Sequence, residues 1–207
     1  MAAPITHIVL TYKVFDRLFN VKDKAAFFVG TSFPDIRYLG ITDRDKTHSH
    51  ENNLAEVIVQ SSFTTGVKFH SLVDRIRENF YRKHNIYPLI PDSVYATQAI
   101  KIYEDILFYD RIKDWKTISG YFDQIHPEEL SYNLKAEDVQ RWHLLLKQYI
   151  QKQPDTDNIR NFIDGISGGR KTMYDEIERV IEEIKNNQIL ENKINEMYIN
   201  FDDLLTE

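Results

Sequence analysis

The chain has 207 residues, of which 42% are hydrophobic and 13% aromatic, so it can bury the core of one large domain. It contains no cysteine, which excludes a disulfide framework and limits any metal site to histidine, carboxylate or backbone ligands. Its net charge of −6 does not favour binding to nucleic acid or to an anionic membrane.

The charge is spread unevenly along the chain. From Arg170 to Glu207 there are five basic and ten acidic residues, so most of the negative charge lies in this last segment. The N-terminal stretch "MAAPITHIVL" lacks the charged start and apolar stretch of a signal peptide. No apolar run is long enough to span a bilayer. These features predict a cytoplasmic protein without an integral membrane segment.

The first 53 residues contain two helical patterns and a long polar stretch. In "THIVLTYKVFDRLF", residues 6–19, the apolar residues have helical spacing, and Thr6 is the expected N-cap. "KDKAAFFVG" predicts a short helix that ends at Gly30, a common stop residue. The segment 31–53 is rich in Asp, Thr, Ser and His and is predicted to be a loop. Loops of this length are usually functional or disordered.

The rest of the chain predicts further helices. They cover about 54–63, 65–83, 94–112 after a Ser93 cap, 114–126, 136–152 and 157–167. Residues 170–188 form an amphipathic pattern whose other face is densely charged. "SGGR", residues 167–170, is predicted to be a loop, with an anion-binding helix N-terminus as the weaker interpretation.

No segment shows the alternation of a strand, so we expect an all-α fold. We expect a single multi-helix domain with a metal site between its helices and a C-terminal helical extension. Residues 1–110 would form the metal-binding core, and residues 111–207 would pack on it.

Five of the seven histidines lie in the first 84 residues, a distribution that suggests a metal site. In "FHSLVDR", His70 and Asp74 are four residues apart, so on a helix they share one face and can bind a single ion. A helix-surface His–Asp pair without a metal is the other interpretation of this short motif. The full set is His7, His48, His50, His70, His84, His126 and His143.

Other histidines also allow both a ligand and a structural interpretation. His7 lies on the first helix, where a lone histidine is more often part of the core than a ligand. His48 and His50 would point the same way in an extended chain, or they could belong to a solvated loop. His84 ends the helix that carries His70, where a cation would also stabilise the helix C-terminus.

Taken in chain order, these residues and the segment "FFVGTSFPDIRYL" resemble the zinc-dependent phospholipase C family. The single-strand-specific zinc nucleases share that fold. The family pattern has a leading His, Gly-x-x-x-Pro-Asp, a loop His, His-x-x-x-Asp, a further His and then His-x-x-x-Glu. The resemblance covers roughly residues 5–110. It implies a helical domain that holds up to three zinc ions.

The resemblance implies a role for each matching residue. One ion would be held by Asp35, His48 or His50, His70 and Asp74. His7 would join Asp74 on a second ion, which makes Asp74 a bridging carboxylate. His84 would belong to a third position. Asp35 would also be the candidate catalytic base.

Two features depart from the family pattern. Glu104 can stand for the Glu of the last motif, but the residue four before it is Ile100, which cannot bind a metal. The third ion would therefore be lost, or held weakly by His84 and Glu104. The secreted family members also use their N-terminal residue as a ligand, whereas His7 here lies six residues after Met1.

The function implied is a metal-dependent hydrolase of phosphoric esters, in which metal-activated water attacks phosphorus. A phospholipid is favoured over a nucleotide, so the substrate would be a small phosphoester or a lipid head group. One or two zinc ions are expected, with manganese, iron and nickel as alternatives. Basic residues on the helix of His70 could contact phosphate or simply face water; these are Lys68, Arg75, Arg77, Arg82 and Lys83.

Two alternatives carry no catalysis. The chain could be a degenerate relative, metal-binding or metal-free, that acts as an interaction module and uses its acidic C-terminal helix as a protein-binding surface. The histidines and acids could also be dispersed in the fold. Other motifs are absent, among them the His-Asp dipeptide of helical phosphohydrolases, His-Glu-x-x-His, Gly-x-Ser-x-Gly and the P-loop.

Overall fold

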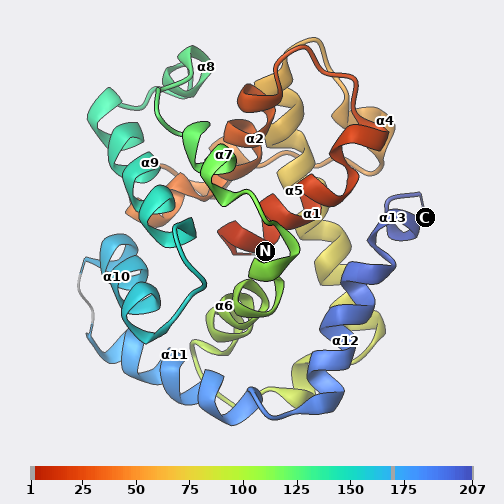
Figure 1. The fold of residues 1–207 in the computed structure, drawn as a ribbon, viewed down its shortest axis with the longest axis vertical. Coiled ribbons are helices and arrows are strands. Elements are labelled where there is room, and N and C mark those ends of the chain that lie inside the picture. Colours follow the sequence, from red (N-terminus) through yellow and green to blue (C-terminus); the bar gives the residue numbers. More distant parts are fainter. Residues whose placement is uncertain (1–2, 169–170, 207) are drawn as a thin grey trace.

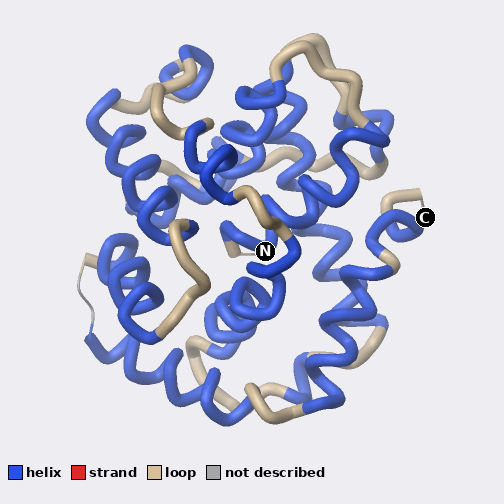
Figure 2. The backbone as a smooth tube through the Cα atoms, viewed as in Figure 1, coloured by secondary structure: helices blue, strands red, loops and turns tan. Residues whose placement is uncertain are grey.

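A computed structural model of the chain describes residues 3–168 and 171–206. Every regular element in these two ranges is a helix, so the predicted all-α fold is confirmed (Figures 1 and 2). The α-helices of the first half are α1 (Pro4–Leu18), α2 (Lys24–Ser32), α3 (Arg44–Thr47), α4 (Leu54–Val57), α5 (Ser62–Lys83) and α6 (Ala96–Phe108). Those of the second half are α7 (Trp115–Gly120), α8 (Pro127–Leu130), α9 (Ala136–Ile150), α10 (Thr156–Ser167), α11 (Lys171–Ile184), α12 (Gln188–Ile199) and α13 (Phe201–Leu204). Three short 3-10 helices join them: η1 (Phe33–Leu39), η2 (Tyr87–Leu89) and η3 (Tyr109–Arg111).

The segment 31–53 is not the long loop that its composition predicted. Thr31 and Ser32 complete α2 beyond Gly30, the chain continues directly into η1, and α3 follows after a turn at Gly40. The polar composition misled the prediction because Phe33, Pro34 and Ile36 are buried and anchor this segment to the core. The segment is therefore folded against the protein, and it presents Asp35 to the interior.

Several other features differ from the prediction; for example, the helix expected over 114–126 ends at Gly120. The helix expected over 54–63 ends at Val57, and α5 begins at Ser62, where the Ser61 side chain accepts a hydrogen bond from the backbone N–H of Thr64. Two helices, α12 and α13, lie beyond the last one predicted. Thr6 is inside α1 rather than at its N-cap. Of the "SGGR" stretch, Gly169 and Arg170 lie outside the described residues, as does Met1.

One hydrophobic core extends from Ile5 to Leu205 and includes both halves of the chain. α6 packs against α11, and the indole N–H of Trp142 on α9 donates to the carbonyl of Ser32 at 3.3 Å. Trp115, Phe122 and Trp142 are buried, as expected for aromatic residues on core faces. In Figure 1, α11 and α12 border the molecule around the first-half helices. No helix in the described part of the chain is both long and apolar enough to cross a membrane.

The contact between α2 and α5 is unusually close, and it depends on two glycines. A Cβ atom on Gly30 would lie 2.1 Å from the carbonyl oxygen of Phe63, and one on Gly66 would lie 2.1 Å from that of Phe27. Real Cβ atoms do not approach a backbone oxygen this closely, so only glycine permits the contact. This close approach brings the C-terminal end of α2 beside the middle of α5, where His70 lies.

Candidate metal centre

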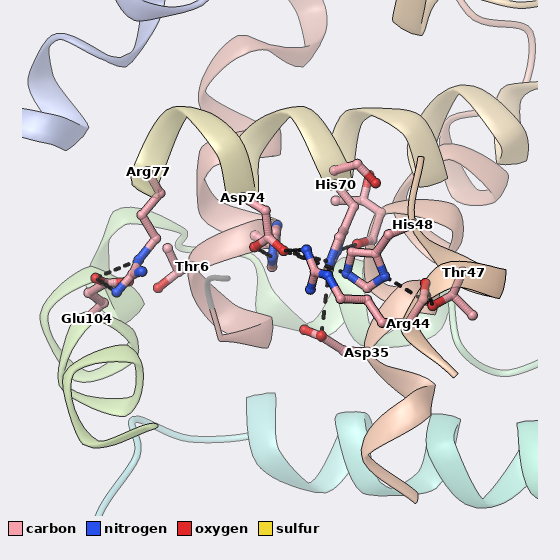
Figure 3. Close-up of polar contacts among 12 residues, drawn as sticks. Thr6, Asp35, Arg44, Thr47, His48, His70, Asp74, Arg77 and Glu104 are labelled. Carbon is pink, nitrogen blue, oxygen red and sulfur yellow. Dashed lines mark hydrogen bonds and ion pairs between the residues drawn. The ribbon is translucent and has the colours of Figure 1, made fainter. Parts of the chain in front are cut away.

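Five side chains from four segments converge beside the middle of α5 (Figure 3). The donor atoms form two groups, and within each group all of them lie within 4.8 Å of one another. One group is His7, His70 and Asp74, and the other is Asp35, His48 and His70. α5 supplies His70 and Asp74, α1 supplies His7, η1 supplies Asp35, and His48 follows α3. The structure thus brings together five of the eight residues that the sequence suggested as ligands. The interpretation in which the histidines and acids are dispersed does not hold for these five.

Asp74 is the centre of the cluster. Its Oδ1 lies 3.3 Å from His7 Nε2, while its Oδ2 lies 3.6 Å from His48 Nε2 and 3.9 Å from His70 Nε2. On the far side, His70 Nε2 lies 4.0 Å from Asp35 Oδ1. Two ligands about 2.0–2.1 Å from a tetrahedral zinc ion are roughly 3.4 Å apart. The donors are therefore spaced close to what one shared ion requires.

Most of these donors are buried without a hydrogen-bond partner. This holds for both ring nitrogens of His7, for Nε2 of His48 and His70, and for both oxygens of Asp35 among the described residues. His7 and His70 are fully buried, and Asp35 is 1% exposed. Buried polar groups are normally paired, and several unpaired ones at one place require an explanation. A cation bound between them would satisfy their lone pairs together, so the residues fit a metal ion.

The orientation of His70 is set by α2. Its Nδ1 donates a hydrogen bond to the carbonyl of Thr31 at 2.7 Å, which leaves the lone pair on Nε2 facing the cluster. Metal-binding histidines commonly donate their other ring N–H to a carbonyl in this way. Burial lowers the pKa of His70 well below its usual value, and His7 beside it lowers it further. The ring is therefore neutral, as a ligand must be.

His48 is oriented by its neighbour in the chain. Its Nδ1 lies 3.0 Å from the hydroxyl of Thr47, and that hydroxyl in turn reaches the carbonyls of Pro34 and Arg44 at 3.3 Å. If the hydroxyl donates to a carbonyl, it accepts from Nδ1–H of His48, and the lone pair on Nε2 then faces Asp74. His48 is therefore presented in the same ligand form as His70.

His7 is positioned by a carboxylate about a hundred residues away in sequence. Asp105 on α6 accepts hydrogen bonds from the backbone N–H of Thr6 at 2.7 Å and of Ile5 at 3.3 Å, and from the Thr6 hydroxyl at 2.8 Å. α1 has no side-chain cap of its own, so Asp105 satisfies N–H groups of its first turn. The ring of His7 then stacks on His70 with centroids 3.7 Å apart.

The two carboxylates of the cluster differ in electrostatics. Burial raises the pKa of Asp35, despite the nearby His7 and Arg37. Burial by itself would also raise the pKa of Asp74, but the adjacent side chains of His48 and His7 bring it well below the usual value. Asp74 is therefore the more acidic of the two carboxyl groups.

The other three suggested ligands lie elsewhere. His50 is exposed and lines the pocket outside the cluster. His84 stacks on Phe80 and lies 3.4 Å from the ammonium group of Lys193. Glu104 is fully buried and receives hydrogen bonds from the guanidinium of Arg77 at 2.6–2.9 Å. The structure thus does not bring His84 and Glu104 together as a third ion site.

Two further histidines have structural roles. His126 accepts a hydrogen bond from the backbone N–H of Glu128 at the start of α8, and its ring stacks on Phe63. His143 on α9 lies 2.8 Å from Glu129 Oε1. Neither residue contributes to the cluster.

A pocket of about 530 Å³ opens beside the cluster, and Asp74 and His48 form part of its wall. Arg44, Arg75 and Lys101 supply positive charge to the same wall. Arg44 lies 3.3 Å from Asp74 Oδ2, with its side chain 45% exposed. Of the basic residues named from the sequence, Arg75 alone lines this pocket, while Arg77 is buried against Glu104.

Sequence reasoning missed several residues of this site. The Thr31 carbonyl, Thr47 and Asp105 carry no recognisable motif, because each acts through contacts that only the fold creates. Lys101 was missed although it lies on the same helix as Glu104.

Comparison with protein-family models, with curated proteins and with solved structures gives no significant match to the chain.

Proposed function

We propose that this protein is a metal-dependent hydrolase of phosphoric esters. The observation that carries the proposal is the convergence of five buried histidine and aspartate side chains, most with unpartnered donor atoms, beside a pocket with basic residues in its wall. Three histidines and two carboxylates suit zinc, and they also suit manganese, iron or nickel. The preference for a phospholipid head group over a nucleotide rests on the family resemblance of residues 5–110.

The donor arrangement supports one well-coordinated ion and a weaker second one. An imidazole nitrogen has a single lone pair, so His70 Nε2 can bind only one ion, whereas a carboxylate can bridge two. The first ion would be held by Asp35, His48, His70 and Oδ2 of Asp74. His7 and Oδ1 of Asp74 would hold the second with only two donors from the described residues. We therefore expect about one tightly bound ion per chain.

The bound ion would lower the pKa of a water molecule and stabilise negative charge on the phosphoryl group. The protein holds the donors in place, through the backbone carbonyl of Thr31 for His70 and through the hydroxyl of Thr47 for His48. Asp35 is the candidate proton acceptor, because one of its oxygens faces His70 and burial raises its pKa above the usual value. The pocket wall at Arg44 and Arg75 favours an anionic substrate.

A second candidate function is an interaction module without catalysis. It is supported by Ile100, which is fully buried where the family pattern has a histidine, and by Glu104, which pairs with Arg77. α11 would offer a charged surface for a partner protein. Part of that charge is paired within the helix, since Arg179 bonds to Glu176 at 2.7 Å and also pairs with Glu183.

Metal analysis followed by an ester panel tests the proposal. Protein purified without chelator should contain about one zinc or similar ion per chain, and zinc should raise its melting temperature. His70→Ala and Asp74→Ala should each abolish tight binding, while His84→Ala, the matched histidine control outside the cluster, should retain it. The panel should contain a phosphomonoester, a phosphodiester, a nucleotide and phosphatidylcholine vesicles.

The outcomes separate the two functions. Hydrolysis that requires the metal and disappears in the His70→Ala protein would support the enzyme and eliminate the interaction module. Metal binding with no turnover of any ester above the His70→Ala control would support the interaction module. A protein that binds no metal, and whose melting temperature zinc does not change, would refute the metal centre itself.

A further inference from the structure

Among the described residues, Lys101 is a buried cation of the pocket beside the metal centre that has no ion-pair partner. Lys101 on α6 is 5% exposed and lines the pocket together with Asp74 and His48. No hydrogen bond or ion pair joins its ammonium group to any of the described residues. The other pocket cations differ: Arg44 is paired with Asp74, and Arg75 donates to the side chain of Asn52 at 2.9 Å.

The absence of a partner for Lys101 has a specific structural cause. Glu104 and Asp105 are three and four residues further along α6, the positions from which a carboxylate reaches a helical lysine. Arg77 and Tyr81 already bind Glu104, and the first turn of α1 already binds Asp105. The fold therefore directs both nearby carboxyl groups to other partners, and the ammonium group of Lys101 has no partner within residues 3–168 and 171–206.

The acidic residues of the pocket form no ion pair with Lys101 within the described ranges, and the charges of Asp35 and Asp74 only partly offset the effect of burial on its pKa. Glu51 pairs with Lys68 at 3.1 Å, and Glu78 bonds to Arg82 at 2.6 Å. Asp45 is exposed and forms no ion pair with Lys101. Asp74 is engaged by His7, His48 and Arg44 at the centre of the cluster.

A lysine that is almost entirely buried and has no ion-pair partner is costly, and proteins normally pair such a group or bind a ligand to it. Burial, with Arg77 nearby, lowers the pKa of Lys101 to about 8, so the group remains mostly protonated at neutral pH. An anion in the pocket would contact both this charge and the metal centre. A tetrahedral oxyanion offers several oxygens that could reach the two at once.

We propose that Lys101 is the anion-binding residue of this pocket and contacts a non-bridging oxygen of the substrate phosphate. This inference rests on the proposed function, because it places the phosphate between Lys101 and the metal donors. It adds a substrate-contacting residue that has no counterpart among the sequence motifs. The phosphate group is the shared chemistry of a small ester and a lipid head group, so Lys101 would contact either.

The test compares Lys101→Met with the wild-type protein, using inorganic phosphate as the probe. Met has a similar length without the charge. Calorimetry of the zinc-loaded full chain should show phosphate bound about 10- to 100-fold more weakly by the variant, the range for a lost bond to a charged group. Zinc affinity should be unchanged. The melting temperature of the phosphate-free variant should rise, because an uncompensated buried charge has been removed.

The matched control is Lys147→Met on α9. Lys147 pairs with Asp123 on another surface, so its removal should leave phosphate affinity unchanged. Equal phosphate affinity of the Lys101→Met and wild-type proteins would overturn the inference about Lys101. That result would not contradict the proposed metal centre. A fall in melting temperature of the Lys101→Met protein would also overturn it, since that result assigns Lys101 a structural role.

The same titration with a chelator separates this inference from the proposed function. If the wild-type protein bound no zinc, the proposed enzyme would fail. Phosphate binding that is retained under chelator and lost in Lys101→Met would still support the anion site. A wild-type protein that binds phosphate in neither form would overturn the assignment of Lys101.

Discussion

Substituting Gly66 by alanine tests how the helix contact supports the metal centre. Gly66 lies one turn before His70 on α5, and a Cβ atom there would lie 2.1 Å from Phe27 O and 2.8 Å from Thr31 N. Both are backbone atoms, so no side-chain rotation can relieve the clash. Carbon–oxygen contacts are normally about 3.3 Å or longer, so α2 and α5 must separate by roughly 1 Å.

The expected cost follows from two opposing effects. Overpacking of this kind destabilises a protein by about 1–3 kcal/mol, and the rigid backbone on both sides favours the upper end of that range. Alanine gains about 1 kcal/mol of helix propensity over glycine. We therefore expect a net loss of about 2 kcal/mol in the free energy of unfolding. The separation also lengthens the bond from His70 to Thr31, so zinc affinity should fall about 10- to 100-fold.

Urea denaturation of the metal-free protein gives the stability, and calorimetry gives the zinc affinity. Gly120→Ala is the matched control, because a Cβ on Gly120 meets only the flexible Asp123 side chain at 3.9 Å. That variant should be as stable as wild type or slightly more so, with unchanged zinc affinity. If the Gly66→Ala protein matched Gly120→Ala in both measurements, the proposed coupling between helix contact and metal site would be refuted.

Three further predictions concern single residues. Glu104→Gln leaves the buried guanidinium of Arg77 without a counter-charge. Urea denaturation should show a free energy of unfolding lower by about 3–5 kcal/mol, with unchanged zinc affinity. A variant as stable as wild type would contradict the buried ion pair. Burial raises the pKa of Asp105 to about 8 from about 3.9 in the unfolded chain, so its stabilising effect is complete below pH 4 and is lost as the pH rises to 8. The stability difference between wild type and Asp105→Asn should therefore shift against wild type from pH 5 to pH 8, and a pH-independent difference would exclude this titration. His48→Ala should abolish tight zinc binding in calorimetry whereas His50→Ala should not, because only His48 reaches the cluster; the reverse result would place the ligand at His50.

Local patterns predicted what depends on neighbours in the chain. The spacing of His70 and Asp74 places both on one face of any helix, and α5 bears this out. The apolar periodicity, with few glycines and prolines, predicted the helical class that the structure confirms. The resemblance implied that Asp35 is a ligand, and the structure buries it in η1. Composition failed for residues 31–53, because a few buried apolar residues outweigh many polar ones.

Tertiary structure decided which donors meet. Glu104 and His84 are residue types that bind metals, and their order in the chain matches the family pattern. However, α5 and α6 pack so that Glu104 forms an ion pair with Arg77, and Lys193 lies beside His84. His48 rather than His50 enters the cluster because Thr47 and η1 hold its ring there.

The sequence by itself determined that this chain is helical and that His70 and Asp74 share a helix face. Those features follow from periodicities of a few residues. The tertiary structure alone decided that α1, η1 and the segment after α3 bring three further donors to that face, and that Lys101 has no partner in the part of the chain that the structure describes. These outcomes depend on close packing between distant segments, such as α2 against α5 at Gly66. No pattern within a single helix specifies such contacts.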